Sequence, residues 1–102
     1  MQDMKFHPGR ILMTPGPVVA IANSGQLPSE FLLRHVAGDW ESMGTVDEKE
    51  NNRALETGLR ILSSYETIKC ERLWIITDGV SVSEGANPKV RELTTIMLPE
   101  EY

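Results

Sequence analysis

The chain has 102 residues, of which 40% are hydrophobic and 25% are charged, and its formal net charge is −5. This length supports one domain around one hydrophobic core, and the composition is that of a folded chain rather than a disordered one. The ten Lys and Arg residues are scattered, with no run of three, so the chain lacks the clustered positive charge that drives non-specific binding to duplex DNA.

The first predicted elements are a short strand and a short helix. A Pro-Gly pair predicts a turn that leads into a strand over residues 10–14. Residues 15–25 predict a helix, because Pro17 suits its first position and Gly25 suits its C-terminal stop. Thr14 is the candidate cap of this helix.

Residues 27–38 predict a second helix that ends at Gly38. Its apolar side is formed by Phe31, Leu32, His35 and Val36, while Glu30 and Arg34 lie toward the other side. This spacing is that of an amphipathic helix with one face toward a core. The helix is therefore expected to place a histidine among apolar side chains.

A third helix is predicted over residues 47–57, with Gly58 as its stop. Asp47 followed by Glu50 has the spacing of a capping box. The apolar side of this helix holds only Ala54 and Leu55. Asn51 lies one turn before the second of these and faces the same way, so we expect its amide to find hydrogen-bond partners under the helix.

Beyond the third helix the pattern changes from helical to alternating. Three stretches rich in Ile, Leu, Thr, Trp and Tyr predict the strands of an antiparallel meander: residues 59–67, 71–78 and 92–99. The first connection is short, and the second, residues 79–89, is long and polar. The sequence therefore predicts one α+β domain with the order β-α-α-α-β-β-β, in which the helices pack on one face of an antiparallel sheet.

The last predicted strand has apolar side chains on both of its faces. Thr94, Ile96 and Leu98 alternate with Leu93, Thr95 and Met97. One face packs on the helices, and the apolar side chains of the other are costly to leave in water. This favours a protein partner or a homodimer, on the open face or across an unpaired edge strand. The alternative is a sheet that is wrapped by its own long loop.

Cysteine content and hydrophobic patterning both bear on the compartment. Cys70 is the only cysteine, so the fold cannot depend on disulfide bonds, which is typical of a reducing cytoplasm. No stretch approaches the ~20 apolar residues that span a bilayer, and the best candidate, residues 11–22, is interrupted by a Pro-Gly-Pro triplet. The first residues do not form a charged and then apolar leader. We expect a cytoplasmic protein without a membrane segment.

Six stretches, which are spread along most of the length of the chain, carry a resemblance: "HPGRILMTPG", "FLLRHVAGDW", "ENNRAL", "ILSSY", "LWIIT" and "TTIMLPEEY". They are similar to a family of small bacterial proteins carried on plasmids and other mobile elements, commonly labelled "plasmid-related protein" and sometimes "type I restriction endonuclease subunit M". The resemblance implies a common fold and a mobile-element origin, and it implies no particular activity.

The chain departs from the family pattern in two places. Glu41 stands where a glycine usually follows the Asp-Trp pair, and residues 79–90 form a longer loop than usual. The methyltransferase-subunit label does not fit, because the chain has no glycine-rich loop after its first strand and no Asn-Pro-Pro-aromatic motif. The chain is also too short for a cofactor-binding doubly wound sheet.

The stretch "RHVAGDWE", residues 34–41, concentrates polar and aromatic side chains within two helical turns. A catalytic interpretation makes His35 a general acid or base, because the pKa of histidine lies near neutral pH. Arg91 and Arg60 would then hold a phosphate, while Tyr65 and Thr95 would supply hydroxyls. The order of elements is similar to that of RelE-type ribonuclease toxins, in which a few side chains on the sheet face promote attack of a 2′-hydroxyl on the adjacent phosphate.

A structural interpretation assigns the same stretch to a helix end and the corner that follows it. His35 then fills space on an apolar face and bonds a backbone carbonyl, Asp39 caps the loop after Gly38, and Trp40 packs over the sheet edge. The sequence favours this interpretation, because the acidic net charge opposes RNA binding.

The sequence predicts neither a metal site nor a cofactor site. The acidic residues of the central segment lack the alternating spacing and the hinge glycine of a calcium loop: Asp39, Glu41, Asp47 and Glu48. His7 and His35 have no neighbouring cysteine that would indicate zinc.

We therefore expect a small accessory protein of a mobile element that acts through contacts with a protein partner or as a homodimer. The candidate binding residues are Asp39, Trp40, Asn51, Trp74 and Arg60. A RelE-like RNA-cleaving or RNA-binding domain is one alternative, with His35 and Arg91 as its main residues. An acidic mimic of nucleic acid that inhibits a defence enzyme is a second, which fits the charge and the origin but no motif.

Overall fold

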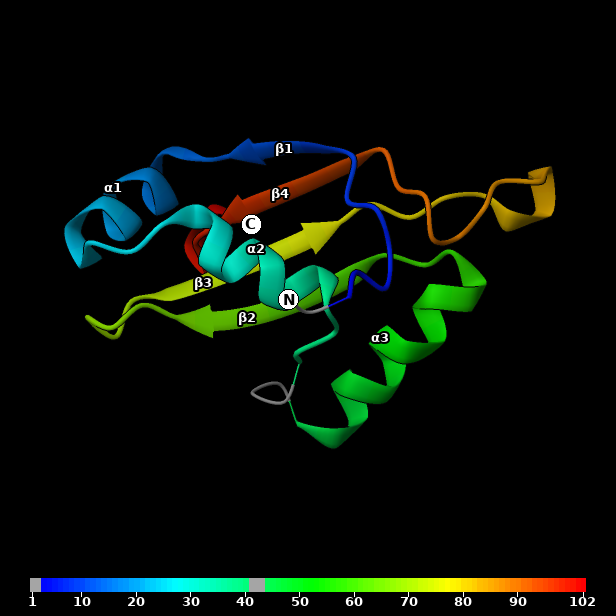
Figure 1. The fold of residues 1–102 in the computed structure, drawn as a ribbon, viewed down its shortest axis with the longest axis horizontal. Helices are drawn as coiled ribbons and strands as arrows, with labels where there is room; N and C mark the ends of the chain where they lie inside the picture. The colour runs from blue at the N-terminus through cyan, green and yellow to red at the C-terminus, as the bar shows by residue number, and fades with distance from the viewer. Residues whose placement is uncertain (1–2, 41–43) are drawn as a thin grey trace.

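The computed structural model describes residues 3–40 and 44–102 of the chain. Within these ranges the chain forms a strand, three helices and then three strands, which confirms the predicted α+β order. Two of the helices lie over one face of the sheet, and the third lies along one of its edges (Figure 1). No helix in the described ranges combines the length and the apolar character needed to cross a membrane.

The helices and strands have the following bounds: β1 (Arg10–Met13), α1 (Pro15–Ser24), α2 (Pro28–Val36), α3 (Thr45–Thr57), β2 (Ile61–Glu66), β3 (Arg72–Thr77) and β4 (Leu93–Met97). There are also two short 3-10 turns: η2 (Val82–Glu84) lies in the loop before β4, and η3 (Pro99–Glu101) follows β4.

The strands lie side by side in the order β1-β4-β3-β2. The last three form the expected antiparallel meander, whereas β1 pairs with β4 in parallel, with Leu12 beside Thr95. The sheet is therefore mixed, which corrects the expectation of a wholly antiparallel one. The reason is topological: the helices carry the chain back, so that β2 starts at the same end as β1, and after two reversals β4 starts there as well (Figure 1).

The start of α1 differs from the prediction, because the helix begins at Pro15 rather than at Pro17. Thr14 occupies the N-cap position, but its hydroxyl donates to Glu101 Oε1 (2.7 Å). The Gly16 N–H donates to Glu101 Oε2 (3.0 Å). A carboxylate from η3 thus serves as the cap, at a helix end where negative charge is favoured. These hydrogen bonds, above all the one from Thr14, lower the pKa of Glu101.

The third helix begins earlier than predicted and ends where predicted. Its first residue is Thr45, so Asp47 lies in the first turn instead of at the N-cap position. At its other end Gly58 has a φ of 82°, and a Cβ there would lie 2.6 Å from the carbonyl oxygen of Val80. The position therefore requires glycine both for its backbone angle and for its close neighbour.

The hydrophobic core consists of two clusters on the helix-covered side of the sheet. The first joins α1 and α2 to the strands and contains Ala20, Ile21, Phe31, Tyr65, Leu73, Ile75 and Ile96. The second lies around the end of α2 and the buried side of α3, and contains Phe6, Val36, Trp40, Ala54, Leu55 and Ile61. Trp40 is thus a core residue of the second cluster rather than a cover over the sheet edge.

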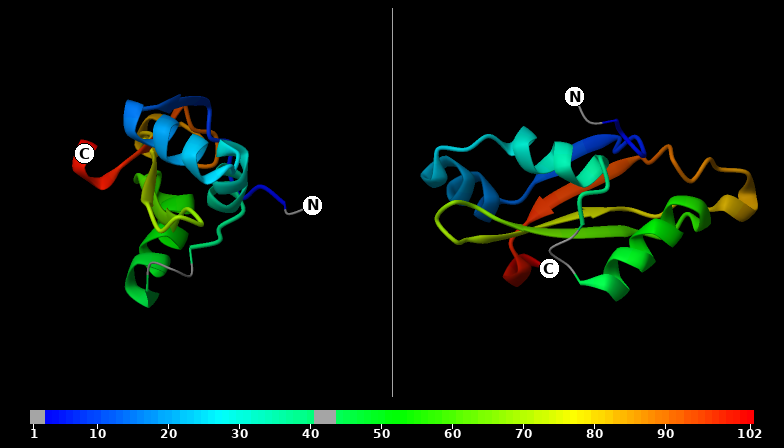
Figure 2. Two further views of the ribbon diagram at one scale, coloured as in Figure 1. Left: turned by 90° about the vertical axis from the view of Figure 1, so that its left-hand side faces the viewer. Right: turned by 60° about the horizontal axis from the view of Figure 1, so that its bottom comes forward.

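The opposite face of the sheet is partly covered by the C-terminal segment. The η3 turn lies on the side away from α1 and α2 (Figure 2). There the ring of Tyr102 meets the ring of Trp74 edge-on, with centroids 5.7 Å apart, and the Arg60 guanidinium donates to the Tyr102 hydroxyl. The long loop before β4 extends past the end of the sheet instead (Figure 1). The predicted alternative of a face wrapped by this loop is therefore wrong.

The outer edge of β2 is occupied by α3. The buried Asn51 amide donates to the carbonyl oxygen of Leu62 (2.6 Å) and accepts a hydrogen bond from the Leu62 N–H (3.2 Å). The side chain thereby reproduces both bonds that another strand would make. This confirms the prediction that Asn51 finds polar partners under its helix.

Replacing Asn51 with Ala is expected to lower the free energy of unfolding by about 2 kcal/mol, because the backbone N–H and the carbonyl oxygen of Leu62 both lose their hydrogen-bond partner. Urea unfolding followed by circular dichroism measures this change. Asn52→Ala is the matched control, since Asn52 is the exposed neighbour on the same helix. Equal stabilities of the two variants would contradict the role of Asn51.

Candidate functional site

The most polar part of the interior is a chain of side chains that begins at His35. Helix α2 directs the imidazole toward the sheet, where Nε2 lies 2.8 Å from Thr77 Oγ1 and Nδ1 contacts Ser63 Oγ. Thr77 Oγ1 lies 2.8 Å from Thr94 Oγ1, and the Thr94 hydroxyl donates to the carbonyl oxygen of Pro8 (2.8 Å). One buried row of polar groups thus joins three strands to the segment before β1.

The directions of these hydrogen bonds follow from the last one. The Thr94 hydroxyl has a single hydrogen, which it donates to Pro8, so Thr77 must donate to Thr94. Thr77 in turn accepts from the Nε2–H of His35, which leaves Nδ1 as the acceptor for the Ser63 hydroxyl. The network therefore contains neutral His35 with its proton on Nε2.

Burial makes this histidine hard to protonate. The side chain is 0% exposed, and desolvation lowers the pKa of His35 to about 3. The Phe6 ring packs edge-on against the imidazole, with centroids 5.3 Å apart. Although a serine hydroxyl beside a histidine is the pairing used in nucleophilic catalysis, Ser63 is also 0% exposed, so neither group reaches solvent.

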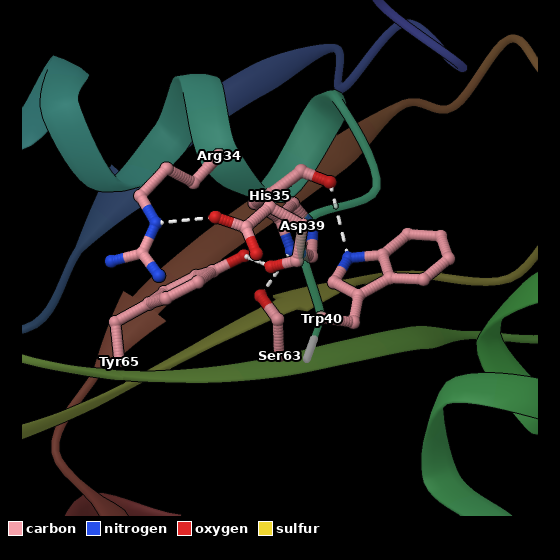
Figure 3. A network of polar contacts seen from close by, with 6 residues as sticks. All are labelled: Arg34, His35, Asp39, Trp40, Ser63 and Tyr65. Atoms are coloured by element: carbon pink, nitrogen blue, oxygen red, sulfur yellow. Dashed lines mark hydrogen bonds and ion pairs between the residues drawn. The ribbon is translucent and has the colours of Figure 1, made fainter. Parts of the chain in front are cut away.

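The corner after α2 is held by its own polar contacts (Figure 3). Gly38 ends the helix in a left-handed conformation, which confirms the predicted stop. Arg34 donates to Asp39 (2.8 Å) and stacks on the Tyr65 ring, 4.5 Å from its centroid. The Tyr65 hydroxyl donates to the Asp39 carbonyl oxygen (2.8 Å), and burial raises the pKa of Tyr65 to about 12. The Trp40 indole N–H donates to the carbonyl oxygen of His35 (3.2 Å).

Arg91 is 3% exposed and lies beyond the C-terminus of α3. Its guanidinium donates to the backbone carbonyl oxygens of Ala54 (2.8 Å), Leu59 (2.8 Å), Asp78 (3.1 Å) and Pro88. These carbonyls belong to the end of α3, the end of β3 and the long loop. The helix dipole favours a cation at this position, and burial lowers the pKa of Arg91.

The structure does not bring the four predicted catalytic residues together. His35 and Tyr65 lie on the helix-covered face of the sheet, whereas Thr95 lies on the opposite face, beside Ile76. Arg91 binds carbonyl groups at the end of α3. The single cleft that the ribonuclease hypothesis requires is not formed by these side chains, and a catalytic role for them stays a prediction.

The candidate binding residues also divide between the interior and the surface. Asp39 pairs with Arg34, and the side chains of Trp40 and Asn51 are buried. Only Trp74 and Arg60 lie on the open face, together with Tyr102. Of the acidic central segment, Glu41 lies outside the described residues.

Three hydroxyl residues of the polar row were not predicted: Ser63, Thr77 and Thr94. Each occupies a position of its strand that faces the core, two residues from a buried isoleucine that faces the same way: Ile61, Ile75 and Ile96, respectively. A polar residue at an inward position is the available signal, because buried hydroxyls need partners. Finding which partner they share requires the strand register, which the sequence does not state.

An apolar hollow, which sequence analysis also missed, lies between α1 and the start of α2. It has a volume of about 220 Å³ and is lined by Met13, Val18, Ile21, Ala22, Gln26 and Pro28. Two exposed apolar side chains stand beside it, Leu27 at 63% and Ile68 at 72%. The Ile68 N–H donates to Gln26 Oε1 (2.9 Å), which ties the β2–β3 turn to this end of the molecule. We call the hollow lined by these six residues, from Met13 to Pro28, the α1–α2 hollow.

Comparisons of the chain with protein families, with curated proteins and with solved structures gave no match. In the part of the chain that the structure describes, no three His, Cys, Asp or Glu side chains are grouped as metal ligands. The site must therefore be interpreted from its own geometry.

Proposed function

We propose that this chain is a small cytoplasmic accessory protein of a mobile genetic element and that it acts by binding another protein. The α1–α2 hollow is the observation that carries the proposal. It combines an apolar lining with exposed Leu27 and Ile68 at one end of the molecule. Exposed apolar groups around a concave site are typical of surfaces that bind a partner.

The chemistry of the hollow and of the whole chain suggests what the partner presents. The lining accommodates an apolar side chain, since Gln26 is its only polar member and is engaged with Ile68 and Glu30. The net charge of −5 favours a partner with a basic surface, which the field of the protein would steer toward it. The mobile-element origin is supported by the resemblance of the six sequence stretches.

A comparison of two leucine variants tests the proposal. Leu27→Asp places a charge beside the hollow, whereas Leu59→Asp changes an equally exposed leucine at the other end of β2. Tagged wild-type and variant chains are used to recover proteins from cells of the native host, and RNA is measured in the same samples. We expect one protein that wild-type and Leu59→Asp retain and Leu27→Asp loses.

Direct titration of that protein, once purified, supplies the deciding measurement. Its affinity for Leu27→Asp is expected to be weaker by about tenfold or more, while its affinity for Leu59→Asp stays at the wild-type value. Recovery of RNA in place of a protein, or equal loss of the protein from both variants, would refute the proposal.

A further inference from the structure

The two edges of the sheet differ in a way that bears on self-association. The outer edge of β2 is bonded at Leu62 to the Asn51 amide of α3. On the other side, β1 is the last strand in the order β1-β4-β3-β2, and no described strand pairs with its outer edge. Figure 1 shows this edge free of covering helices along the length of β1.

The open edge has both the backbone groups and the side chains of a pairing surface. The Arg10 and Thr14 N–H groups donate to β4 and its flank (3.0 Å each), so the alternating residues Ile11 and Met13 direct their N–H and C=O groups outward. Ile11 and Leu12 are 39% and 42% exposed. The strand contains no lysine, no proline and no bulge, and Arg10 is its one charged residue.

We infer that β1 pairs with β1 of a second copy of this chain, antiparallel, with Leu12 on the two-fold axis. In this register Ile11 lies opposite Met13 of the second copy, and all the outward peptide groups of both residues form hydrogen bonds. Leu12 lies opposite Leu12 of the second copy at a pair without hydrogen bonds. The result is one continuous sheet formed by the two copies.

Charge complementarity selects this register. Arg10, Leu12 and Thr14 alternate along the strand and share the face opposite α1 and α2. Arg10 therefore lies opposite Thr14 of the second copy, whose hydroxyl holds Glu101. Neither Arg10 nor Glu101 has an ion pair within the described residues. The pairing brings Arg10 of each copy close to Glu101 of the other copy, so the dimer contains this oppositely charged pair twice. A register centred on Met13 would instead place Ile11 opposite Pro15, which has no N–H.

This dimer goes beyond the proposed function, because Leu12 is not part of the α1–α2 hollow. The two ideas can fail separately. A Leu12 variant that is monomeric can still bind a partner at the hollow, and Leu27→Asp can still form the dimer.

Sedimentation equilibrium of the whole chain over a series of concentrations gives the first test. The weight-average mass of the wild type is expected to rise from 11.4 kDa toward twice that value. Leu12→Lys should stay monomeric, since it sets two charges against each other on the axis, and Leu59→Lys should behave as the wild type. A wild-type mass that does not change with concentration, or a Leu12→Lys variant that dimerises equally, would overturn the inference.

Cysteine cross-linking gives a second test that needs no disruption of the dimer. In a Cys70→Ser background, the variant Leu12→Cys places one cysteine of each copy at facing positions. Their Cα atoms are then about 4.5 Å apart, which is within the range that a disulfide can span. Arg10→Cys is the control on the same strand and face, because its two copies lie roughly 13 Å apart. Oxidation should yield a covalent dimer from Leu12→Cys only. Equal cross-linking at both positions, or none at Leu12→Cys, would exclude this register.

Discussion

Lowering the pH from about 7 to about 5 should reduce the free energy of unfolding by about 2 kcal/mol through His35 alone. The pKa of His35 is about 3 in the folded chain and 6.5 as its ordinary value. Below pH 6.5 the unfolded chain therefore binds a proton that the folded chain does not bind. The contribution of neutral His35 to the free energy of unfolding is complete above pH 6.5. It decreases by roughly 1.4 kcal/mol per pH unit as the pH falls from there toward 3.

Urea unfolding at a series of pH values measures this effect, with His35→Gln as the comparison. The variant is expected to be less stable at neutral pH, because Ser63 and Thr77 lose a well-placed partner, but its stability should depend less on pH between 7 and 5. Parallel pH profiles for the two proteins would contradict the assignment. If the variant does not fold, proton resonances of the wild-type imidazole that titrate near pH 6.5 would contradict it equally.

The same experiment separates the two interpretations of the histidine. A general acid or base works best with a pKa near the working pH. A neutral imidazole with a pKa of about 3 instead serves to connect the hydroxyls of Ser63 on β2 and Thr77 on β3. Titration near neutral pH would therefore return His35 to the list of catalytic candidates.

Replacing Arg91 with Ala should lower the free energy of unfolding by about 3 kcal/mol or more. Four backbone carbonyls would lose their donor at a buried junction between α3, β3 and the long loop. Arg91→Lys should recover only a small part of this loss, because one ammonium group cannot reach the carbonyls that a planar guanidinium bridges. Thermal and urea unfolding of the three proteins measure the differences.

Arg53→Ala is the matched control for this prediction. Arg53 is exposed on α3 and its ion pair with Glu50 is long (3.8 Å), so its removal should change the stability by less than about 0.5 kcal/mol. Under the ribonuclease hypothesis Arg91 would hold a phosphate, and its loss would leave stability nearly unchanged. A stable Arg91→Ala variant would therefore contradict the structural role.

Local features of the fold could be predicted from the sequence because their causes are local. The spacing of Phe31, His35 and Val36 indicated the buried face of α2, and Gly38 and Gly58 marked the ends of their helices. Asn51 was recognised as a buried amide because it shares a helix face with Ala54 and Leu55. Each of these inferences uses only neighbours within two turns of helix.

Features that depend on distant segments could not be predicted. The cap of α1 comes from Glu101, which the sequence places at the opposite end of the chain. The partners of His35 depend on the register that brings Thr77 beside Thr94. The α1–α2 hollow depends on how two helices diverge, and the parallel direction of β1 depends on the path of the chain through all three helices.

The parallel pair of β1 and β4 also has a consequence for how the chain reaches its native state. The Thr14 N–H donates to the carbonyl oxygen of Ile96 although the two residues are 82 positions apart, so closing this pair means ordering a very long loop. Pairings of such high contact order form slowly. During synthesis β1 is the first of the strands to leave the ribosome. It stays unpaired, with Ile11 and Leu12 uncovered, until β4 has also left the ribosome. Nascent chains that lack β4 should therefore be the species most in need of chaperones.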